Sequence, residues 1–493
     1  MPTSNTKNPP VFPPAFVWGA ASSSLQIEGG SSPDLRGESV WDSFCRKPDG
    51  VHEGHTPQVA CDHYRRYQED VQIMADMKLK AYRLSINWPR VMREGAGAIN
   101  QGGLEFYDRL IDALLERNIE PWVTLFHWEF PLALYHKGGW LNRDSAEWFG
   151  EYSTRVVERL SDRVTHWMTI NEPQVYLQLG HVDGTHAPGI KLPLKEALLA
   201  GHNTLRAHGR CVQAIRAAAR KQPTIGWAPV GHVSFPVTED PDEVEAARAA
   251  TFAVKKTDLW NNTWFSDPVC FGCYPEDGLR MYGTNAPSFP AGDMDLIRQP
   301  IDFYGVNIYS GGAVKADGTP APVSSAPGRA RNSMHWNVAP EALRWGARFL
   351  WERYRLPVVI TENGMCNLDW VDSHGQVLDP QRIDYTRRYL SELHRAIQDG
   401  ADVRGYFHWS ILDNFEWAEG YRERFGLVYV DYATQKRTPK LSAAWYKRVI
   451  ETNGRSLIEP TGLSVQASTT RAASLDSSLT EVIRNGSNGS TSA

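Results

Sequence analysis

The chain alternates short β-rich runs with longer segments in which apolar residues recur every three or four positions. We predict eight strands: Phe16–Ala20, Ala81–Ile86, Pro121–Phe126, Thr165–Ile170, Thr224–Pro229, Ile301–Val306, Pro357–Thr361 and Val403–Trp409. Between them lie helical faces such as that of Leu104, Tyr107, Ile111 and Leu114, whose spacing places the apolar side chains on one side of a helix. Strands that alternate with helices pair in parallel through right-handed crossovers, and eight such units favour a closed barrel.

We therefore predict an α/β protein, a single (β/α)8 TIM barrel with extended loops on the strand C-terminal face. Residues 1–11 would be an N-terminal extension and residues 12–455 the barrel. Long connections after the first, fourth, fifth and sixth strands explain the excess over the roughly 250 residues of a typical barrel. Residues 456–493 are rich in Ser and Thr without a sustained pattern, so we expect a disordered tail.

Composition narrows the range of partners. With 42% hydrophobic and 22% charged residues, the chain can bury a large core. A net charge of -5 gives no attraction to nucleic acid or to anionic membranes. No apolar stretch is long enough for a bilayer, and no signal peptide is visible, so we expect a cytoplasmic protein. Oligomeric state is not indicated.

The cysteines and histidines show no metal-binding pattern. Six cysteines are scattered along the chain: Cys45, Cys61, Cys211, Cys270, Cys273 and Cys366. Only Cys270 and Cys273 have a suggestive spacing, and neither a second pair nor nearby histidines accompanies them. We expect reduced thiols in the core, no metal site and no cofactor.

Two glutamates mark the candidate chemistry. Glu172 and Glu362 each follow an apolar strand, the fourth and the seventh, so they should project into one cavity from nearly opposite walls. A facing pair of carboxyl groups is what cleavage of a glycosidic bond needs, one to protonate the leaving oxygen and one to attack or to activate water. From position alone, the two glutamates could equally be metal ligands, helix caps or surface charges.

Aromatic and polar residues gather at the same strand ends. The tryptophans are Trp128, Trp336, Trp409 and Trp417, and the polar residues beside them are Gln26, His127, Asn171 and Glu416. Sugar rings stack their C–H faces on indole, while their hydroxyl groups need charged or amide partners. Each tryptophan alone would more often be a core residue. Together the residues favour a carbohydrate site.

Five segments of the chain, taken together, match the sequence pattern of a known protein family. They are residues 16–29 (FVWGAASSSLQIEG), 125–128 (LFHW), 169–173 (TINEP), 359–364 (VITENG) and 405–417 (GYFHWSILDNFEW). In this order they resemble glycoside hydrolase family 1, the retaining β-glucosidases and their relatives. The segments extend over the chain apart from its tail, which makes the set far more specific than any single tripeptide.

The resemblance implies a retaining exo-β-glycosidase, most closely a β-glucosidase acting on cellobiose-like or aryl β-glucosides through a covalent glycosyl-enzyme. Glu172 would be the general acid/base and Glu362 the nucleophile. The implied substrate-binding residues are Gln26, His127, Trp128, Asn171, Asn307, Tyr309, Trp336, Trp409, Glu416, Trp417 and Phe425. Tyr309 would hydrogen-bond the nucleophile, and Trp336 would flank the leaving group.

The chain departs from the family pattern at Leu25, Glu129, Gln174 and Asn337. We expect Gln174, Trp336 and Asn337 to touch the leaving-group side, which leaves the leaving-group preference open. Glu416 would repel a phosphate, which argues for unphosphorylated glycosides.

The two carboxyl groups should differ in protonation. In a retaining enzyme they stand about 5–5.5 Å apart, so repulsion keeps one protonated. We predict that Glu362 is ionised, because a Tyr309 hydroxyl favours the anion, and that Glu172 carries the proton. Three alternatives stay open: β-galactosidase or β-fucosidase specificity, a non-catalytic sugar-binding barrel, and a metal-dependent barrel hydrolase.

Overall fold

The computed structural model describes residues 9–32, 35–322 and 328–459. The chain divides into two compact units, residues 1–457 and 458–493. The first unit contains the barrel and every element described below, apart from the last residue of one short helix. Most of the expected tail, from residue 460 onward, lies outside the described residues.

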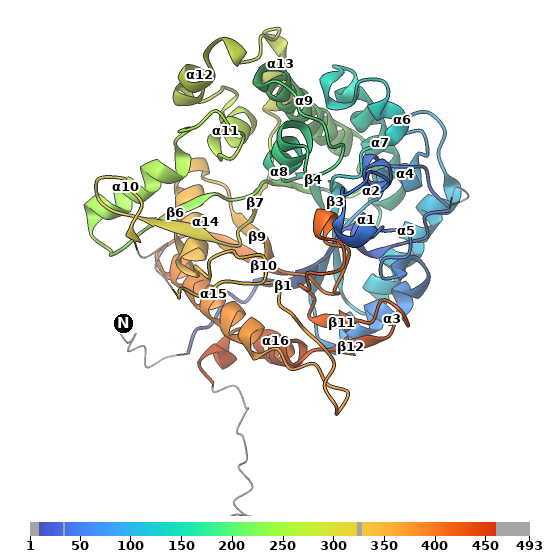
Figure 1. The fold of residues 1–493 in the computed structure, drawn as a ribbon, viewed down its shortest axis with the longest axis vertical. Helices are drawn as coiled ribbons and strands as arrows, with labels where there is room; N and C mark the ends of the chain where they lie inside the picture. Colours follow the sequence, from blue (N-terminus) through green and yellow to red (C-terminus); the bar gives the residue numbers. More distant parts are fainter. Residues whose placement is uncertain (1–8, 33–34, 323–327, 460–493) are drawn as a thin grey trace, which may run out of the picture. The chain divides into compact units, whose positions relative to one another are not determined.

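Within the described residues, eight parallel strands close into a barrel, which confirms the predicted TIM-barrel fold (Figure 1). They are β1 (Val17–Ala21), β2 (Ala81–Ser85), β3 (Glu120–Phe126), β4 (His166–Asn171), β5 (Thr224–Ala228), β7 (Phe303–Asn307), β9 (Val358–Asn363) and β10 (Val403–Trp409). The order around the ring is β1-β10-β9-β7-β5-β4-β3-β2, and β1 pairs with both β10 and β2. Each strand overlaps one that the sequence predicts.

Four strands end later than the sequence predicts, namely β1, β4, β7 and β9. β4 continues to Asn171 and β9 to Asn363, so Glu362 lies inside a strand and not after it. The parallel pairing continues past small register shifts, with Asn307 opposite Glu362 and Asn171 opposite Ala228. Polar side chains therefore stand on the inner wall at the top of the barrel, where the backbone is still held by ladder hydrogen bonds.

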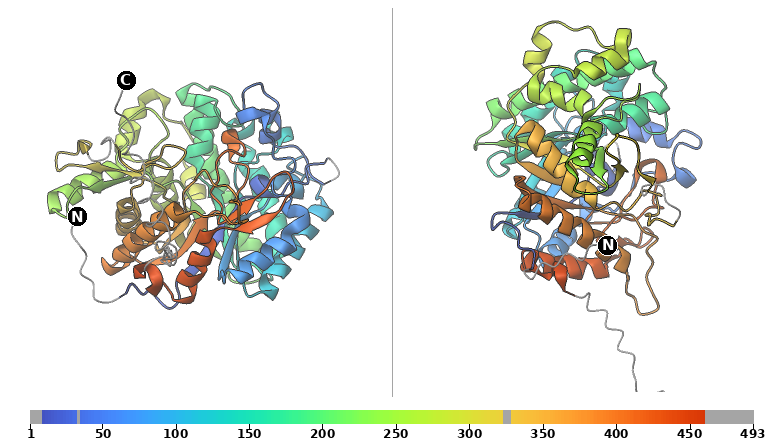
Figure 2. Two further views of the ribbon diagram at one scale, coloured as in Figure 1. Left: turned by 60° about the horizontal axis from the view of Figure 1, so that its bottom comes forward. Right: turned by 90° about the vertical axis from the view of Figure 1, so that its left-hand side faces the viewer.

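The helices lie outside the ring of strands, as Figure 1 shows and as the two further views of Figure 2 also show. The longer ones are α3 (His63–Asp76), α5 (Gln101–Glu116), α7 (Ser145–Leu160), α9 (Leu194–Ala218), α10 (Pro241–Phe252), α14 (Glu341–Tyr354), α15 (Pro380–Gln398) and α16 (Leu441–Glu451). The apolar face predicted for α5 is buried along its length. Helices of this kind cover the outer face of a parallel sheet.

Short elements occupy the connections. The short helices are α1 (Ser24–Ile27), α2 (Val40–Cys45), α4 (Trp88–Val91), α6 (Leu132–Tyr135), α8 (Pro173–Leu177), α11 (Thr263–Phe271), α12 (Glu276–Tyr282) and α13 (Gly292–Ile297). Single turns are η1 (His52–Gly54), η2 (Gly139–Leu141), η3 (Gln178–Asp183), η4 (Gly283–Asn285), η6 (Trp417–Glu419) and η7 (Arg455–Ile458). β6 (Val233–Pro236) pairs with β8 (Gly311–Val314), and β11 (Val428–Val430) pairs with β12 (Arg437–Pro439).

A separate apolar cluster fills the inside of the barrel. It includes Trp122, Met168, Phe303 and Phe407, and it reaches Trp409 near the strand C-terminal ends. Because the barrel is packed below this level, an open site can form only above it, where the loops begin.

Four of the six cysteines are buried, as expected. The expectation is wrong for Cys273, which is exposed in the turn between α11 and α12, and Cys270 is partly buried. No helix in the described part of the chain is long and apolar enough to cross a membrane.

Gly364 directly follows β9 and lies against the end of β10, two residues after the predicted nucleophile. A Cβ atom there would stand 1.9 Å from the carbonyl oxygen of Trp409. We expect Gly364→Ala to lower the free energy of unfolding by about 1–3 kcal/mol, because backbone must move to make room. At Gly312 an added Cβ meets nothing within 4 Å, so Gly312→Ala is the control. Equal melting temperatures for the two variants would contradict this reading of the strand contact.

Candidate active site

A cavity of about 730 Å³ opens among the loops at the strand C-terminal ends. Ten of the residues expected at the site line it: His127, Trp128, Glu172, Tyr309, Trp336, Glu362, Trp409, Glu416, Trp417 and Phe425. The other three, Gln26, Asn171 and Asn307, are fully buried. Each hydrogen-bonds a residue that lines the cavity: Gln26 bonds Glu416, Asn171 bonds His127 and Asn307 bonds Glu172. The fold therefore brings the whole predicted set together.

Glu172 stands at the turn between β4 and α8. Its backbone is left-handed, with a φ of 44°, and its amide donates to the carbonyl of Ala228 at 2.8 Å. Pro173 begins the helix directly after it. This sharp turn aims the carboxyl group into the cavity, where Asn307 donates to Oε1 at 2.9 Å. Burial, together with the negative charge of Glu362, raises the pKa of Glu172 well above its ordinary value.

Glu362 has stronger partners for an anion. Arg83 donates to Oε1 at 2.5 Å, and the Tyr309 hydroxyl donates to Oε2 at 2.7 Å. Burial raises the pKa of Glu362, while the charge of Arg83 and the hydrogen bond from Tyr309 oppose that shift. Because a cation faces Glu362 and only an amide faces Glu172, the shared negative charge belongs on Glu362 and the proton on Glu172.

Arg83 is a site residue that sequence reasoning missed. It lies in β2 with about 1% of its surface exposed, and it also donates to Asn171 Oδ1 at 2.7 Å and to the Thr361 carbonyl at 3.1 Å. The available signal was an arginine inside a strand predicted to be buried, Ala81–Ile86. A charge in such a position is rare unless it is paired.

Asn307 connects the two walls of the site. Its amide donates to Glu172 and to Asn171 Oδ1, at 2.9 and 3.0 Å, and its carbonyl oxygen accepts from the Thr361 hydroxyl at 2.6 Å. One side chain on β7 thus links the end of β4 to β9. The two glutamates belong to one hydrogen-bonded network.

Asn171 and His127 form the next contact along the wall. Burial, with the charge of Arg83, holds the pKa of His127 well below its ordinary value, so the imidazole is neutral. Its Nε2 lies 3.2 Å from the Asn171 amide and accepts a hydrogen bond from it. The side-chain carbonyl of Asn171 accepts from Arg83 and Asn307, so this amide is held in one orientation by the protein.

Gln26 and Glu416 make a polar pair at another part of the wall. Gln26 Nε2 lies 3.3 Å from Glu416 Oε2 and 3.0 Å from Asn414 Oδ1, and its own carbonyl accepts from the Ser23 hydroxyl at 2.7 Å. Burial, with a contribution from the charge of Glu362, raises the pKa of Glu416 to about 8. Glu416 lines the cavity and can donate to or accept from a sugar hydroxyl group, whereas Gln26 lies behind it and donates to Asn414 and to the Phe415 carbonyl.

Aromatic rings form one side of the cavity. Trp409 and Trp417 lie nearly parallel to the His127 ring, at interplanar angles of 14° and 18°. The Trp128 ring lies 4.6 Å from that of Trp417, and its indole N–H donates to the Asn171 carbonyl at 3.0 Å. The indole N–H of Trp128 is therefore bonded within the protein, and the face of the ring is the part of Trp128 that can contact a ligand.

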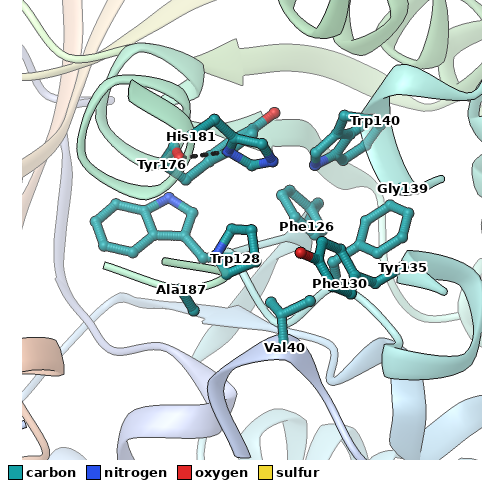
Figure 3. A pocket seen from close by; sticks show the side chains of 11 residues that line it. Val40, Phe126, Trp128, Phe130, Tyr135, Gly139, Trp140, Tyr176, His181 and Ala187 are labelled. Atoms are coloured by element: carbon teal, nitrogen blue, oxygen red, sulfur yellow. Dashed lines mark hydrogen bonds between the residues drawn. The ribbon is translucent and has the colours of Figure 1, made fainter. Parts of the chain in front are cut away.

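Behind Trp128 the packing is tight. Figure 3 shows Phe126, Phe130, Trp140 and Tyr176 around a small internal cavity of about 10 Å³. The dashed line there is the hydrogen bond from His181 Nδ1 to the Tyr176 carbonyl, at 3.0 Å. A wall backed in this way holds the Trp128 ring in one position.

The entrance is lined by Trp336, which is 37% exposed, together with Tyr309 and Phe425. Two expectations for this region are wrong. Gln174 is buried and its side chain bonds the backbone at Val230, so Val175 and not Gln174 faces the cavity. Asn337 is likewise absent from the lining, where its neighbour Trp336 stands.

One other acidic residue near the strand ends, Glu28, has structural partners. Glu28 accepts from Arg90 and from the Tyr107 hydroxyl, at 2.8 and 2.7 Å, and it does not line the cavity. Among the described residues, no group of three or more His, Cys, Asp or Glu side chains is placed to hold a metal ion.

Comparisons with known proteins now bear on this site. The model of glycosyl hydrolase family 1 matches residues 8–455. The chain belongs to glycosyl hydrolase family 1. A "1,4-beta-D-glucan glucohydrolase" of Thermotoga neapolitana is 45% identical over 446 residues, which cover 90% of this chain and 99% of that protein. The protein is therefore an O-glycoside hydrolase.

Solved structures agree with this assignment. A "Beta-glucosidase from Thermotoga maritima in complex with deoxynojirimycin" is 43% identical, with a TM-score of 0.82. The same description with galacto-hydroximolactam as the ligand gives 43% identity and a TM-score of 0.83. Both matches cover 90% of this chain and 99% of the other chain.

The role assigned to Arg83 can be tested by a pH profile. In Arg83→Met the cation beside Glu362 is lost, so the pKa of Glu362 rises. We expect the acid limb of kcat/KM for an aryl β-glucoside to move to higher pH, because kcat/KM reports groups of the free enzyme. Arg83→Lys keeps a positive charge and should shift the limb less. An acid limb that stays in place in Arg83→Met would contradict the assignment.

Glu129, directly after Trp128, supplies a test of stability. Burial raises its pKa to about 8. The folded state therefore holds a proton that the unfolded state releases at lower pH, and stability falls as the pH rises through that interval. We expect the gain in melting temperature of Glu129→Gln over the wild type to grow up to about pH 8. Glu38→Gln, at a side chain 56% exposed, is the control. A gain in melting temperature that does not change with pH would contradict the raised pKa of Glu129.

Proposed function

We propose that this protein is a retaining exo-β-glucosidase that hydrolyses terminal non-reducing β-D-glucosyl residues of cellobiose-like or aryl β-glucosides. The observation that carries the proposal is the unequal environment of two carboxyl groups on one cavity. Arg83 and Tyr309 bond Glu362, whereas Glu172 receives a hydrogen bond from Asn307. The names of the similar proteins, a glucan glucohydrolase and a β-glucosidase, point to the same substrate class. Residues 12–455 would form the catalytic domain.

In the first step the Glu362 carboxylate attacks the anomeric carbon while Glu172 gives its proton to the glycosidic oxygen. The bond from the anomeric carbon to that oxygen breaks, and the alcohol leaves. The sugar stays on Glu362 as an ester. Desolvation in the cavity strengthens the electrostatic part of this step, since few waters compete for the charges.

In the second step the charge on Glu362 is gone, so of the two main causes that raise the pKa of Glu172, burial and this charge, only burial remains. Glu172, now ionised, accepts a proton from a water molecule that attacks the anomeric carbon, and Glu362 leaves as the carboxylate. The configuration at the anomeric carbon is retained. Arg83 is not stranded in the intermediate, because Asn171 Oδ1 and the Thr361 carbonyl remain its acceptors.

The glycone would be held by the polar residues of the wall. His127 and Glu416, backed by Asn171 and Gln26, face the hydroxyl groups, Trp409 supplies the stacking surface, and Phe425 closes the pocket near the primary alcohol. A second glycone, β-galactosyl, is favoured by one observation. A relative with 43% identity has been solved with galacto-hydroximolactam bound.

The azide products of two variants test the roles. We expect Glu172→Ala and Glu362→Gly each to lower kcat/KM for cellobiose by about 10³-fold or more, because each removes one half of the double displacement. With azide and an aryl β-glucoside, Glu172→Ala should release β-glucosyl azide, since azide attacks the glycosyl-enzyme without a general base. Glu362→Gly should release α-glucosyl azide, because azide takes the place of the missing carboxylate.

Chromatography against both glucosyl azide standards, with NMR of the anomeric proton, identifies the products. The same anomer from both variants would reject the assignment of acid/base and nucleophile. Wild-type activity in either variant would reject the glutamate pair.

A further inference from the structure

The segment from Asp413 to Gly426 forms one wall of the cavity, and we call it the pocket loop. It begins four residues after β10 and contributes Glu416, Trp417 and Phe425 to the lining. Apart from the single turn η6, it has no regular secondary structure. Backbone bonds hold parts of it, since the Phe415 amide donates to the Gln26 carbonyl at 3.1 Å and Arg424 forms an isolated bridge with Asn367. Side-chain contacts at its base add to these.

Asp413 ties the two ends of the pocket loop together. Its Oδ1 accepts from the Gly426 amide at 2.9 Å, and its Oδ2 accepts from the Arg424 guanidinium at 2.7 Å. The approach is close, because a Cβ at Gly426 would lie 2.1 Å from the Asp413 nitrogen. The loop is therefore closed by one carboxylate at its base.

That carboxylate belongs to a buried ion network. Lys440, the residue before α16, donates to Asp413 Oδ1 at 2.7 Å and to Asp369 Oδ2 at 2.6 Å. Arg382 on α15 donates to Asp369 at 2.7 Å and to the Arg424 carbonyl of the pocket loop at 2.8 Å. The side chains of Asp369, Arg382, Asp413 and Lys440 are at most 1% exposed.

The physics of buried ions gives this network one favoured geometry. A charge removed from water is tolerated only while its partners are in place, and loss of one partner leaves the other uncompensated. A pocket loop displaced at its base would separate Asp413 from Lys440 and the Arg424 carbonyl from Arg382. The network thus opposes alternative positions of the loop more strongly than neutral contacts would.

The catalytic carboxyl groups depend on other partners. Glu172 and Glu362 are bonded by Arg83, Asn307 and Tyr309, which lie on β2, at the end of β7 and just beyond it. Neither Lys440 nor Asp369 contacts these residues in the hydrogen bonds that place them. The two networks hold different parts of the same cavity.

We propose that the ion network of Asp369, Arg382, Asp413 and Lys440 is a positioning device that fixes the base of the pocket loop and, through Phe425 between Arg424 and Gly426, sets the preference for the C6 hydroxymethyl group of the glycone. This inference rests on the proposed function. It predicts that weakening the network changes which glycone is preferred before it changes the chemistry.

Two aryl glycosides measure this preference. 4-Nitrophenyl β-D-xyloside lacks the hydroxymethyl group that 4-nitrophenyl β-D-glucoside carries. In Lys440→Met we expect the ratio of kcat/KM, glucoside over xyloside, to fall about tenfold, while kcat/KM for the xyloside stays within about threefold of the wild type. Asp369→Asn keeps the contact between Lys440 and Asp413, and it should lower the ratio in the same direction by less.

Asp267→Asn is the matched control. Asp267 lies on α11, is 5% exposed and accepts from Arg353 and Tyr354, so its loss disturbs a buried ion pair elsewhere in the protein. It should lower the melting temperature and leave the ratio unchanged. If Lys440→Met does not fold, the ratio of kcat/KM measured for Asp369→Asn decides the test.

A ratio unchanged in the folded network variants would overturn the inference, as would an equal fall in Asp267→Asn. A wild-type protein that cleaves neither glycoside would reject the proposed function, and the inference with it.

Discussion

Arg83 is the buried cation that makes the two carboxyl groups of the cavity unequal. Two carboxyl groups that share a desolvated cavity would both tend to be neutral, since burial disfavours each anion. Arg83 lowers the cost of one negative charge, and it does so at Glu362 because its guanidinium bonds that carboxylate. Glu172 has an amide partner instead, and it keeps its proton. Environment alone gives two identical side chains opposite roles.

The barrel positions this arrangement from several independent strands. Arg83, Asn307 and Glu362 come from β2, β7 and β9, and Glu172 directly follows β4. Each is held by ladder pairing or by a tight turn, so the distances between them depend on the rigid part of the fold and not on loops. The pocket loop is anchored separately by Asp413 and its buried ion partners. The carboxyl pair and the pocket loop therefore have different supports.

Much of this could be predicted from the sequence. Alternating strand and helix patterns predict the barrel, because each strand must be buried on both faces, and the segments around Glu172 and Glu362 indicate the chemistry. Arg83 was missed because its partners, Asn171 and Thr361, are distant along the chain and only the closed ring brings them together. Gln174 was misplaced since adjacency to a motif does not specify direction after a left-handed turn. The ion network depends on residues from four separate segments, which no local pattern connects.

The central claim is that burial, together with the charge on Glu362, keeps Glu172 protonated. Carboxyl-carbon NMR of protein labelled with ¹³C at glutamate side chains, with Glu172→Gln used to assign the signal, measures the titration of Glu172 directly. The account predicts that the pKa of Glu172 falls clearly in Glu362→Gln relative to the wild type, because the repelling charge is removed while burial is kept. A Glu172 that titrates at the same pH in both proteins, or that is already ionised in the wild type at neutral pH, would contradict it.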